Sequence, residues 1–305
     1  MPGRLCIPVD AEGDVKDTYA DVAFPSADGR LKLYARDYAG AGPCLLMMHG
    51  LTRNSADFAG LANHFAGRFR VVVPDQRGRG RSQYDPEPAN YTPAVYCADM
   101  LGMIVRLGLR RPVLIGTSMG GLMAMAMGSM APAGYRGIVL NDVGPVVDSA
   151  GLARIADYVG NAPEVRDWTG AAEYCRLTNG SAFPHYGDAD WQRFARRLFV
   201  EDADGVPRLA YDPAIAAGLA GSDPGAVPVD LWPMWDALAP LPILAIRGEN
   251  SDILGAATLA EMGRRHPGMH SASVAGVGHA PMLDEPEAVA AIERFLDETC
   301  APGMA

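Results

Sequence analysis

Short apolar runs and amphipathic segments alternate along most of the chain, which indicates repeated strand–helix units. The apolar runs of the first half have the length of buried strands and lie at residues 44–48, 71–73, 112–115 and 137–141. After the first of these runs, Phe58, Leu61, Ala62 and Phe65 recur at the spacing of one helix face. Continuous apolar strands that alternate with such helices are typical of a parallel sheet covered on both faces.

A hairpin and a well-marked helix start can also be placed in the first half. Residues 18–24 and 30–38 predict two strands joined by a turn that contains Asp-Gly, a common hairpin sequence. Thr92 followed by Pro93 predicts a helix start, because a threonine cap and a proline in the first helical position suit the open end of a helix. This helix is expected to bury Cys97, Leu101, Ile104 and Val105.

The strand–helix rhythm is interrupted in the middle of the chain and then resumes. The later elements are predicted as strands at 241–246 and 269–274 and helices at 256–265 and from about Asp284. From about 146 to 228 the pattern predicts helices and turns but no buried parallel strand. We therefore predict an α/β fold in which residues 1–145 and 229–305 form the core domain and residues 146–228 form a helical insertion.

Residues 116–120 have the sequence G-T-S-M-G and lie between a predicted strand and a helix-forming run. A strand that ends in G-x-S-x-G and continues as a helix is a nucleophile elbow, whose turn leaves no room for side chains at the two outer positions. The elbow holds Ser118 above the sheet edge and leaves the backbone N–H of Met119 free to bind an oxyanion. Ser118 is the predicted nucleophile.

A serine hydroxyl needs a base near neutral pH, and the base needs a carboxylate to orient it. Of the six histidines, His279 directly follows the last predicted strand, which places it at the sheet edge. His266 and His270 are expected to face solvent, and His64 and His185 do not follow strands. His279 is therefore the predicted base.

The carboxylate partner is sought between the serine and the histidine, since this is the chain order expected for an elbow of this kind. Asp252 lies in the loop after the strand that ends at residue 246 and is the predicted acid. Asp142, which follows an earlier strand, and Glu249, in the same loop as Asp252, remain alternatives. If they have no catalytic role, Asp142 is a polar residue at the end of a strand and Glu249 is a solvated carboxylate.

The loop after the strand at 44–48 is the expected source of a second oxyanion donor. It reads His49-Gly50-Leu51-Thr52. Gly50 lets the backbone turn, and the N–H of Leu51 would then face the site from the side opposite the Met119 N–H. His49 is expected to hydrogen-bond the backbone rather than to titrate during catalysis.

Charge and composition exclude several classes of partner. Among 305 residues, 36 acidic side chains outnumber 26 basic ones, and a net charge of −10 argues against nucleic acid or an anionic membrane as the main partner. Arg77, Arg79 and Arg81 form the only tight basic cluster and are interpreted as a solvated turn. The glycines of this cluster lack the lysine and spacing of a phosphate loop, and we expect neither a cofactor nor a metal.

Cysteine usage and the lack of a leader-like segment indicate a cytoplasmic protein. The cysteines are scattered without paired spacing, which favours reduced thiols; they are Cys6, Cys44, Cys97, Cys175 and Cys300. The amino terminus has no charged region followed by a long apolar stretch, and no run approaches the ~20 apolar residues that span a bilayer.

Taken together, these segments resemble the α/β-hydrolase fold enzymes over about residues 18–298. The resemblance is carried by residues 49–51, 75–82 and 116–121, by the Asp252 loop and by Gly278-His279. It implies a mostly parallel eight-stranded sheet, a cap at 146–228 inserted after the sixth strand, and a structural turn at 75–82. Epoxide hydrolases and haloalkane dehalogenases carry aspartate at the elbow, so serine at 118 argues against both.

Within that family the chain looks like bacterial carboxylesterases, enol-lactonases and serine-dependent C–C hydrolases. The resemblance implies hydrolysis of a small carboxylic ester or lactone through an acyl-enzyme. Hydrolysis of a C–C bond in a ring-cleavage product is the alternative, and a ligand-sensing protein on the same fold is the non-enzyme alternative. The aromatic residues expected to pack rather than to line a pocket are Trp191, Tyr211, Trp232 and Trp235. The natural substrate and the oligomeric state stay open.

Overall fold

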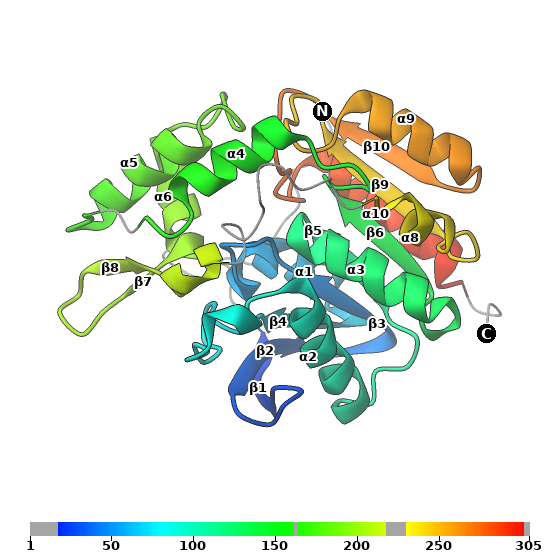
Figure 1. Ribbon diagram of the computed structural model, residues 1–305, viewed down its shortest axis with the longest axis horizontal. Coiled ribbons are helices and arrows are strands. Elements are labelled where there is room, and N and C mark those ends of the chain that lie inside the picture. Colours follow the sequence, from blue (N-terminus) through cyan, green and yellow to red (C-terminus); the bar gives the residue numbers. More distant parts are fainter. Residues whose placement is uncertain (1–17, 162–163, 218–229, 302–305) are drawn as a thin grey trace.

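The computed structural model describes residues 18–161, 164–217 and 230–301. Eight strands form one sheet in the order β1-β2-β4-β3-β5-β6-β9-β10 (Figure 1). Their bounds are β1 (Tyr19–Pro25), β2 (Lys32–Tyr38), β3 (Gly40–Met48), β4 (Gly67–Asp75), β5 (Val113–Thr117), β6 (Gly137–Asn141), β9 (Ile243–Gly248) and β10 (His270–Val274). β1 and β2 form the predicted hairpin, β2 also pairs antiparallel with β4, and all later neighbours pair in parallel.

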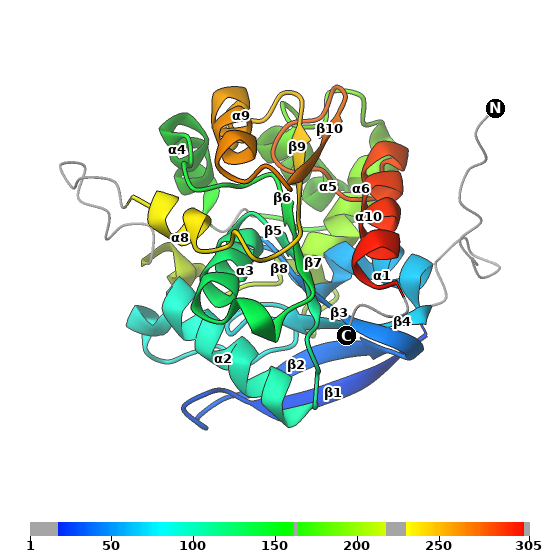
Figure 2. The same cartoon turned by 90° about the vertical axis from the view of Figure 1, so that its right-hand side faces the viewer.

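Helices cover both faces of this sheet, as Figure 2 shows from its edge. α1 and α10 lie on one face, and α2, α3, α8 and α9 lie on the other (Figure 2). The helices are α1 (Ala59–Phe65), α2 (Pro93–Arg106), α3 (Met119–Met130), α8 (Trp232–Asp236), α9 (Ala256–Arg265) and α10 (Pro286–Thr299). Short 3-10 helices are η1 (Ser55–Phe58), η2 (Pro88–Asn90) and η3 (Pro132–Gly134). Because both faces are covered, Leu45, Leu114 and Val139 have no exposed surface.

The chain between β6 and β9 adds elements that do not join the main sheet. These are α4 (Ser149–Tyr158), α5 (Trp168–Asn179), α6 (Asp188–Leu198), β7 (Phe199–Glu201), β8 (Pro207–Leu209) and the 3-10 helix η4 (Pro213–Ala216). They gather at one end of the molecule, left of the sheet in Figure 1. The described part of this segment contains no parallel strand, as predicted, although β7 and β8 form a small antiparallel pair. Residues 162–163 and 218–228 of the predicted insertion lie outside the described residues.

Helix length and hydropathy show whether a helix could span a membrane. Among the described residues, no helix is long and apolar enough to cross a bilayer.

Candidate active site

The turn between β5 and α3 has the geometry expected of an elbow. Ser118 adopts φ +52° and ψ −115°, a conformation that L-residues rarely occupy. A Cβ on Gly116 would lie 2.3 Å from the Gly120 carbonyl oxygen, and a Cβ on Gly120 would lie 2.0 Å from the Met48 carbonyl oxygen. Backbone therefore fills the space that side chains would need, and both glycines are required.

A chain of hydrogen bonds connects Ser118 to a buried carboxylate through His279. The Ser118 Oγ lies 2.9 Å from His279 Nε2, and His279 Nδ1 lies 2.8 Å from Asp142 Oδ2. With Nδ1–H donating to the carboxylate, Nε2 is left to accept the serine hydroxyl proton. The histidine side chain is 8% exposed and the Asp142 side chain is fully buried. The structure thus brings together the predicted nucleophile, the predicted base and one of the alternative acids.

Hydrogen-bond donors surround the Asp142 carboxylate. Its Oδ1 accepts the backbone N–H of Gly248 at 2.9 Å, and its Oδ2 also accepts the Ser251 hydroxyl at 2.7 Å. The residue has φ +58°, in the left-handed region that aspartate tolerates better than most residues. Its carboxylate is buried but well satisfied, which is the condition for keeping a charge away from water.

The predicted pairing of Asp252 with the histidine is corrected by these contacts. The Asp252 carboxylate instead accepts a two-fold hydrogen bond from Arg154 on α4, at 2.6 and 2.9 Å, and its side chain is 36% exposed. The Arg154 guanidinium holds the pKa of Asp252 below its usual range, against a smaller opposing effect of burial. The other alternative, Glu249, accepts the backbone N–H of Gly276 at an exposed site.

The two predicted oxyanion donors lie on loops that meet at the elbow. Met119 begins α3, so its N–H has no acceptor in its own helix. No acceptor for the Leu51 N–H is found within the part of the chain that the structure describes. A Cβ on Gly50 would lie 3.7 Å from Ser118 Cβ, which shows how closely this loop approaches the serine.

His49 has the structural role expected for it. Its Nδ1 donates to the Gly50 carbonyl at 2.7 Å, and its Nε2 accepts the Gln76 N–H at 3.0 Å. Burial lowers the pKa of His49 to about 4, so the ring is neutral at physiological pH.

His266 differs from the prediction. It is buried and contacts the Leu241 carbonyl, so its prediction as a solvent-facing residue was wrong.

Two of the three clustered arginines are buried, so the interpretation of a solvated turn was wrong for them. Arg77 pairs with Asp99 at 2.8 Å and with Asp85 at 2.5 Å. Arg79 has no exposed surface, and among the described residues no carboxylate lies within 4 Å of it. Arg81 does lie at the surface, 57% exposed.

Arg79 supports the loop that carries the Leu51 N–H. Its Nε donates to the Leu51 carbonyl at 2.8 Å, and its Nη1 donates to the Tyr96 hydroxyl at 2.9 Å. Its Nη2 lies 4.0 Å from the sulfur of Met119. Burial lowers the pKa of Arg79, and contact with Tyr96 partly offsets that effect. The sequence pattern did not predict this role of Arg79, because an arginine between two glycines resembles a surface turn.

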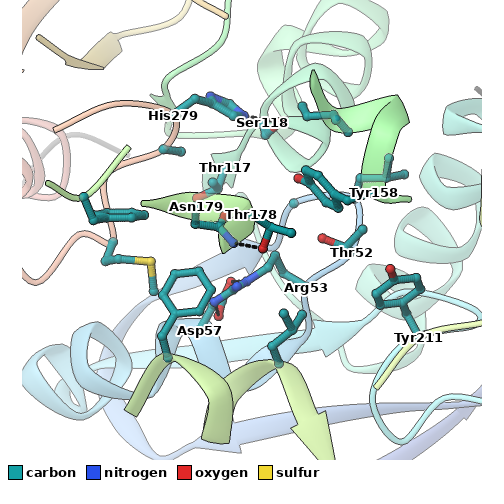
Figure 3. A pocket seen from close by; sticks show the side chains of 18 of the residues that line it. Thr52, Arg53, Asp57, Thr117, Ser118, Tyr158, Thr178, Asn179, Tyr211 and His279 are labelled. Atoms are coloured by element: carbon teal, nitrogen blue, oxygen red, sulfur yellow. Dashed lines mark hydrogen bonds and ion pairs between the residues drawn. The ribbon is translucent and has the colours of Figure 1, made fainter. Parts of the chain in front are cut away.

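A pocket opens beside Ser118 and His279, as Figure 3 shows. Its walls come from the loop after β3 and from η1 on one side and from α4, α5, α6 and β8 on the other. Three of its polar side chains are Arg53, Asp57 and Asn179. Trp191, Tyr211 and Trp235 are buried as expected, and Tyr211 also lines the pocket. Within the described residues no group of three or more histidine, cysteine or acidic side chains could hold a metal ion.

Comparisons with known proteins agree with this architecture. The profile of a family described as the alpha/beta hydrolase family matches residues 45–292. Over 257 residues the chain is 34% identical to a 3-hydroxybutyrate-oligomer hydrolase of Cupriavidus necator, covering 82% of this chain and 87% of that protein. It is 30% identical over 271 residues to a 2-(acetamidomethylene)succinate hydrolase of Mesorhizobium japonicum, covering 88% and 93%.

A solved structure extends the comparison to three dimensions. The crystal structure of an alpha/beta hydrolase from Novosphingobium aromaticivorans superposes with a TM-score of 0.87 at 41% identity, covering 92% of this chain and 98% of that one. The sequence match and this superposition confirm the predicted fold class.

Proposed function

The chain belongs to the alpha/beta hydrolase family, and we propose on that premise that it is a serine hydrolase of a small carboxylic ester or lactone. The observation that carries the proposal is the hydrogen-bonded series Ser118–His279–Asp142, whose serine and histidine line a pocket. Such a series is what an acyl-enzyme mechanism needs, because it activates a hydroxyl that is otherwise unreactive at neutral pH.

Each group of this proposed triad has one role in the proposed mechanism. As Ser118 Oγ attacks the carbonyl carbon, its proton passes to His279 Nε2, and the resulting imidazolium is stabilised by Asp142. The tetrahedral oxyanion would accept hydrogen bonds from the N–H groups of Leu51 and Met119. The histidine then protonates the leaving alcohol. In the second half of the cycle it takes a proton from water, which attacks the acyl-enzyme and releases the acid.

The elements between β6 and β9 are proposed to act as a cap. The pocket lies between them and the core, since Tyr158 of α4, Asn179 of α5 and Phe194 of α6 line one side of it. A cap in this place would exclude water from the acyl-enzyme until the substrate is bound.

Two similar proteins support an oxygen-rich acid as substrate. One is named for hydrolysis of 3-hydroxybutyrate oligomers, whose units are joined by esters. The other is named for a substituted succinate. The complete triad argues against a ligand-sensing protein that has lost turnover.

Covalent labelling tests the proposal directly. A fluorophosphonate probe is expected to add one adduct per chain, located on the peptide that contains Ser118, and Ser118→Ala is expected to abolish it while remaining folded by circular dichroism. A folded wild-type protein that does not label would contradict the proposal. A panel of aryl esters, lactones and vinylogous diketones then separates ester hydrolysis from C–C cleavage, which would be favoured if the diketones react fastest.

A further inference from the structure

Arg53 lies at the end of the same loop that carries the Leu51 N–H. Its backbone N–H donates to the Gly50 carbonyl at 3.2 Å and closes the turn. A Cβ on Gly50 would lie 3.6 Å from Arg53 Cγ and 3.7 Å from Ser118 Cβ. The arginine side chain therefore starts beside the nucleophile, and Figure 3 shows its guanidinium inside the pocket.

The guanidinium is held rigidly and carries its charge. Its Nε and Nη2 donate to the two carboxylate oxygens of Asp57, at 2.6 and 2.5 Å, and its plane lies over the Phe194 ring, 4.1 Å from the centroid. The Arg53 side chain is only 13% exposed. Burial opposes the charge, but the Asp57 carboxylate outweighs it and raises the pKa of the guanidinium.

One edge of this guanidinium is left for a ligand. Arginine has five N–H groups, and the Asp57 pair uses only those on the Nε edge. For the Nη1 group and the second Nη2 proton, no acceptor is found among the described residues. This second edge has the spacing of a carboxylate and can bind its two oxygens at once.

The charges around the pocket favour an anion at this edge. Apart from His279 and neutral tyrosines, Arg53 and Asp57 are the only acidic or basic side chains among the described residues that line it, and both Asp57 oxygens already accept from Arg53. Thr178 and Asn179 add neutral polar groups. A carboxylate would thus meet the second edge of a preorganised cation, while Asp57 is bound along the Nε edge.

We propose that Arg53 binds a free carboxylate of the substrate, so that the site selects short esters that carry a negative charge near the scissile bond. An ester of a hydroxy acid with a free terminal carboxylate fits this description. The inference rests on the proposed ester hydrolysis, to which it adds the substrate class. Arg53 is thereby a specificity-determining residue, and its contribution depends on the charge of the ligand.

A pair of substrates that differ only in charge provides the test. The linear dimer of 3-hydroxybutyrate and its terminal primary amide have the same length, and each contains one ester bond. We expect the wild type to hydrolyse the acid with a kcat/KM about tenfold or more above that for the amide. Arg53→Gln is expected to bring this ratio close to one, mainly through the KM of the acid, whereas Asp57→Asn is expected to raise it.

A matched control separates recognition from general damage. Arg193→Gln removes an exposed arginine of α6 that is paired with Asp190, outside the pocket, and is expected to leave the ratio unchanged. If Arg53→Gln lowers both rates equally, the arginine is only structural and the inference is wrong. Thermal unfolding shows whether Arg53→Gln is folded. If it is not, the test is made with Asp57→Asn, in which the acid-to-amide ratio of kcat/KM is expected to rise above that of the wild type.

Binding without turnover keeps this inference distinct from the proposed function. In the Ser118→Ala background, calorimetry is expected to show that Arg53→Gln weakens binding of the dimer acid about tenfold and leaves binding of the amide unchanged. Equal affinity for acid and amide would overturn the inference even if the enzyme hydrolyses esters. Conversely, absence of esterase activity and of Ser118 labelling would contradict the proposed function alone.

Discussion

Asp142 reaches the histidine because of its own backbone conformation. It stands directly after β6 with φ +58°, and its N–H donates to the Ile246 carbonyl of the neighbouring strand. The left-handed turn directs the carboxylate toward the end of β9, where Gly248 and Ser251 donate to it. The same contacts that satisfy the buried charge fix the orientation of the oxygen that His279 contacts.

The environment of the half-buried Glu285 predicts a pH-dependent stability. Its Oε1 accepts the Met282 N–H at 2.9 Å, while Oε2 is buried without a partner among the described residues. Burial raises the pKa of Glu285 to about 7, and the neighbouring Asp284 adds to the effect. Because the folded pKa lies above the unfolded value of 4.5, folding favours the protonated form, and stability is lost as pH rises from about 4.5 to 7.

Glu285→Gln keeps the acceptor and removes the titration. Relative to the wild type, this variant is expected to gain about 2–3 kcal/mol more at pH 8 than at pH 5, since one pKa unit corresponds to about 1.4 kcal/mol. Urea unfolding at the two pH values measures the difference. An equal effect of the substitution at both pH values would show that Glu285 is not protonated in the folded state.

At the residue scale, the carboxylate that contacts His279 could not be chosen from the sequence. β6 and β9 are adjacent and parallel, so the loops that carry Asp142 and Asp252 leave the sheet at the same edge. Position along the chain therefore admits both residues. The choice depends on a left-handed backbone angle at Asp142 and on Arg154 of α4, which binds Asp252, and neither is visible in strand or helix patterning.

At the scale of elements, the rotation of α2 was harder to predict than its position. The helix starts at Thr92-Pro93 as predicted, with the Thr92 side chain accepting the Val95 N–H. Cys97 is buried, but Val105 is 82% exposed, while Met100 and Met103 fill the core instead. Apolar side chains surround most of this helix, so periodicity alone leaves its orientation about the helix axis undetermined.

Arg79 connects the elements whose ends carry the proposed oxyanion donors. It supports the carbonyl of Leu51 after β3 and contacts Met119 at the start of α3. Arg79→Met is expected to lower kcat about tenfold or more with little change in KM. The N–H donors of Leu51 and Met119 would be less well positioned for the oxyanion of the transition state, whereas binding of the substrate depends little on them.

Steady-state kinetics on a neutral aryl ester measures this effect, with thermal unfolding to check the fold. Arg81→Met is the matched control, since Arg81 belongs to the same turn but pairs with Asp21 at the surface. An unchanged kcat in Arg79→Met, or an equal loss in Arg81→Met, would contradict a positioning role for Arg79.

At the scale of the whole molecule, the site is a consequence of sheet topology. Leu51, Ser118 and Asp142 follow the adjacent parallel strands β3, β5 and β6, and His279 follows β10. Carboxyl ends of parallel strands meet at one edge, so alternating strands and helices were enough to predict that these residues converge. The pocket could not be predicted in this way, because its far wall comes from α4–α6, whose packing depends on contacts without a repeating pattern.

The proposed mechanism depends most on which carboxylate orients His279, and kcat/KM for 4-nitrophenyl butyrate in three proteins tests this directly. Compared with the wild type, Asp142→Asn is expected to lose about 10³–10⁴-fold, because the imidazole loses the carboxylate that holds its tautomer and its charge. Asp252→Asn, which disturbs only a partly exposed ion pair, is expected to stay within about threefold. A large loss in Asp252→Asn together with near-normal turnover in Asp142→Asn would contradict the role proposed for Asp142.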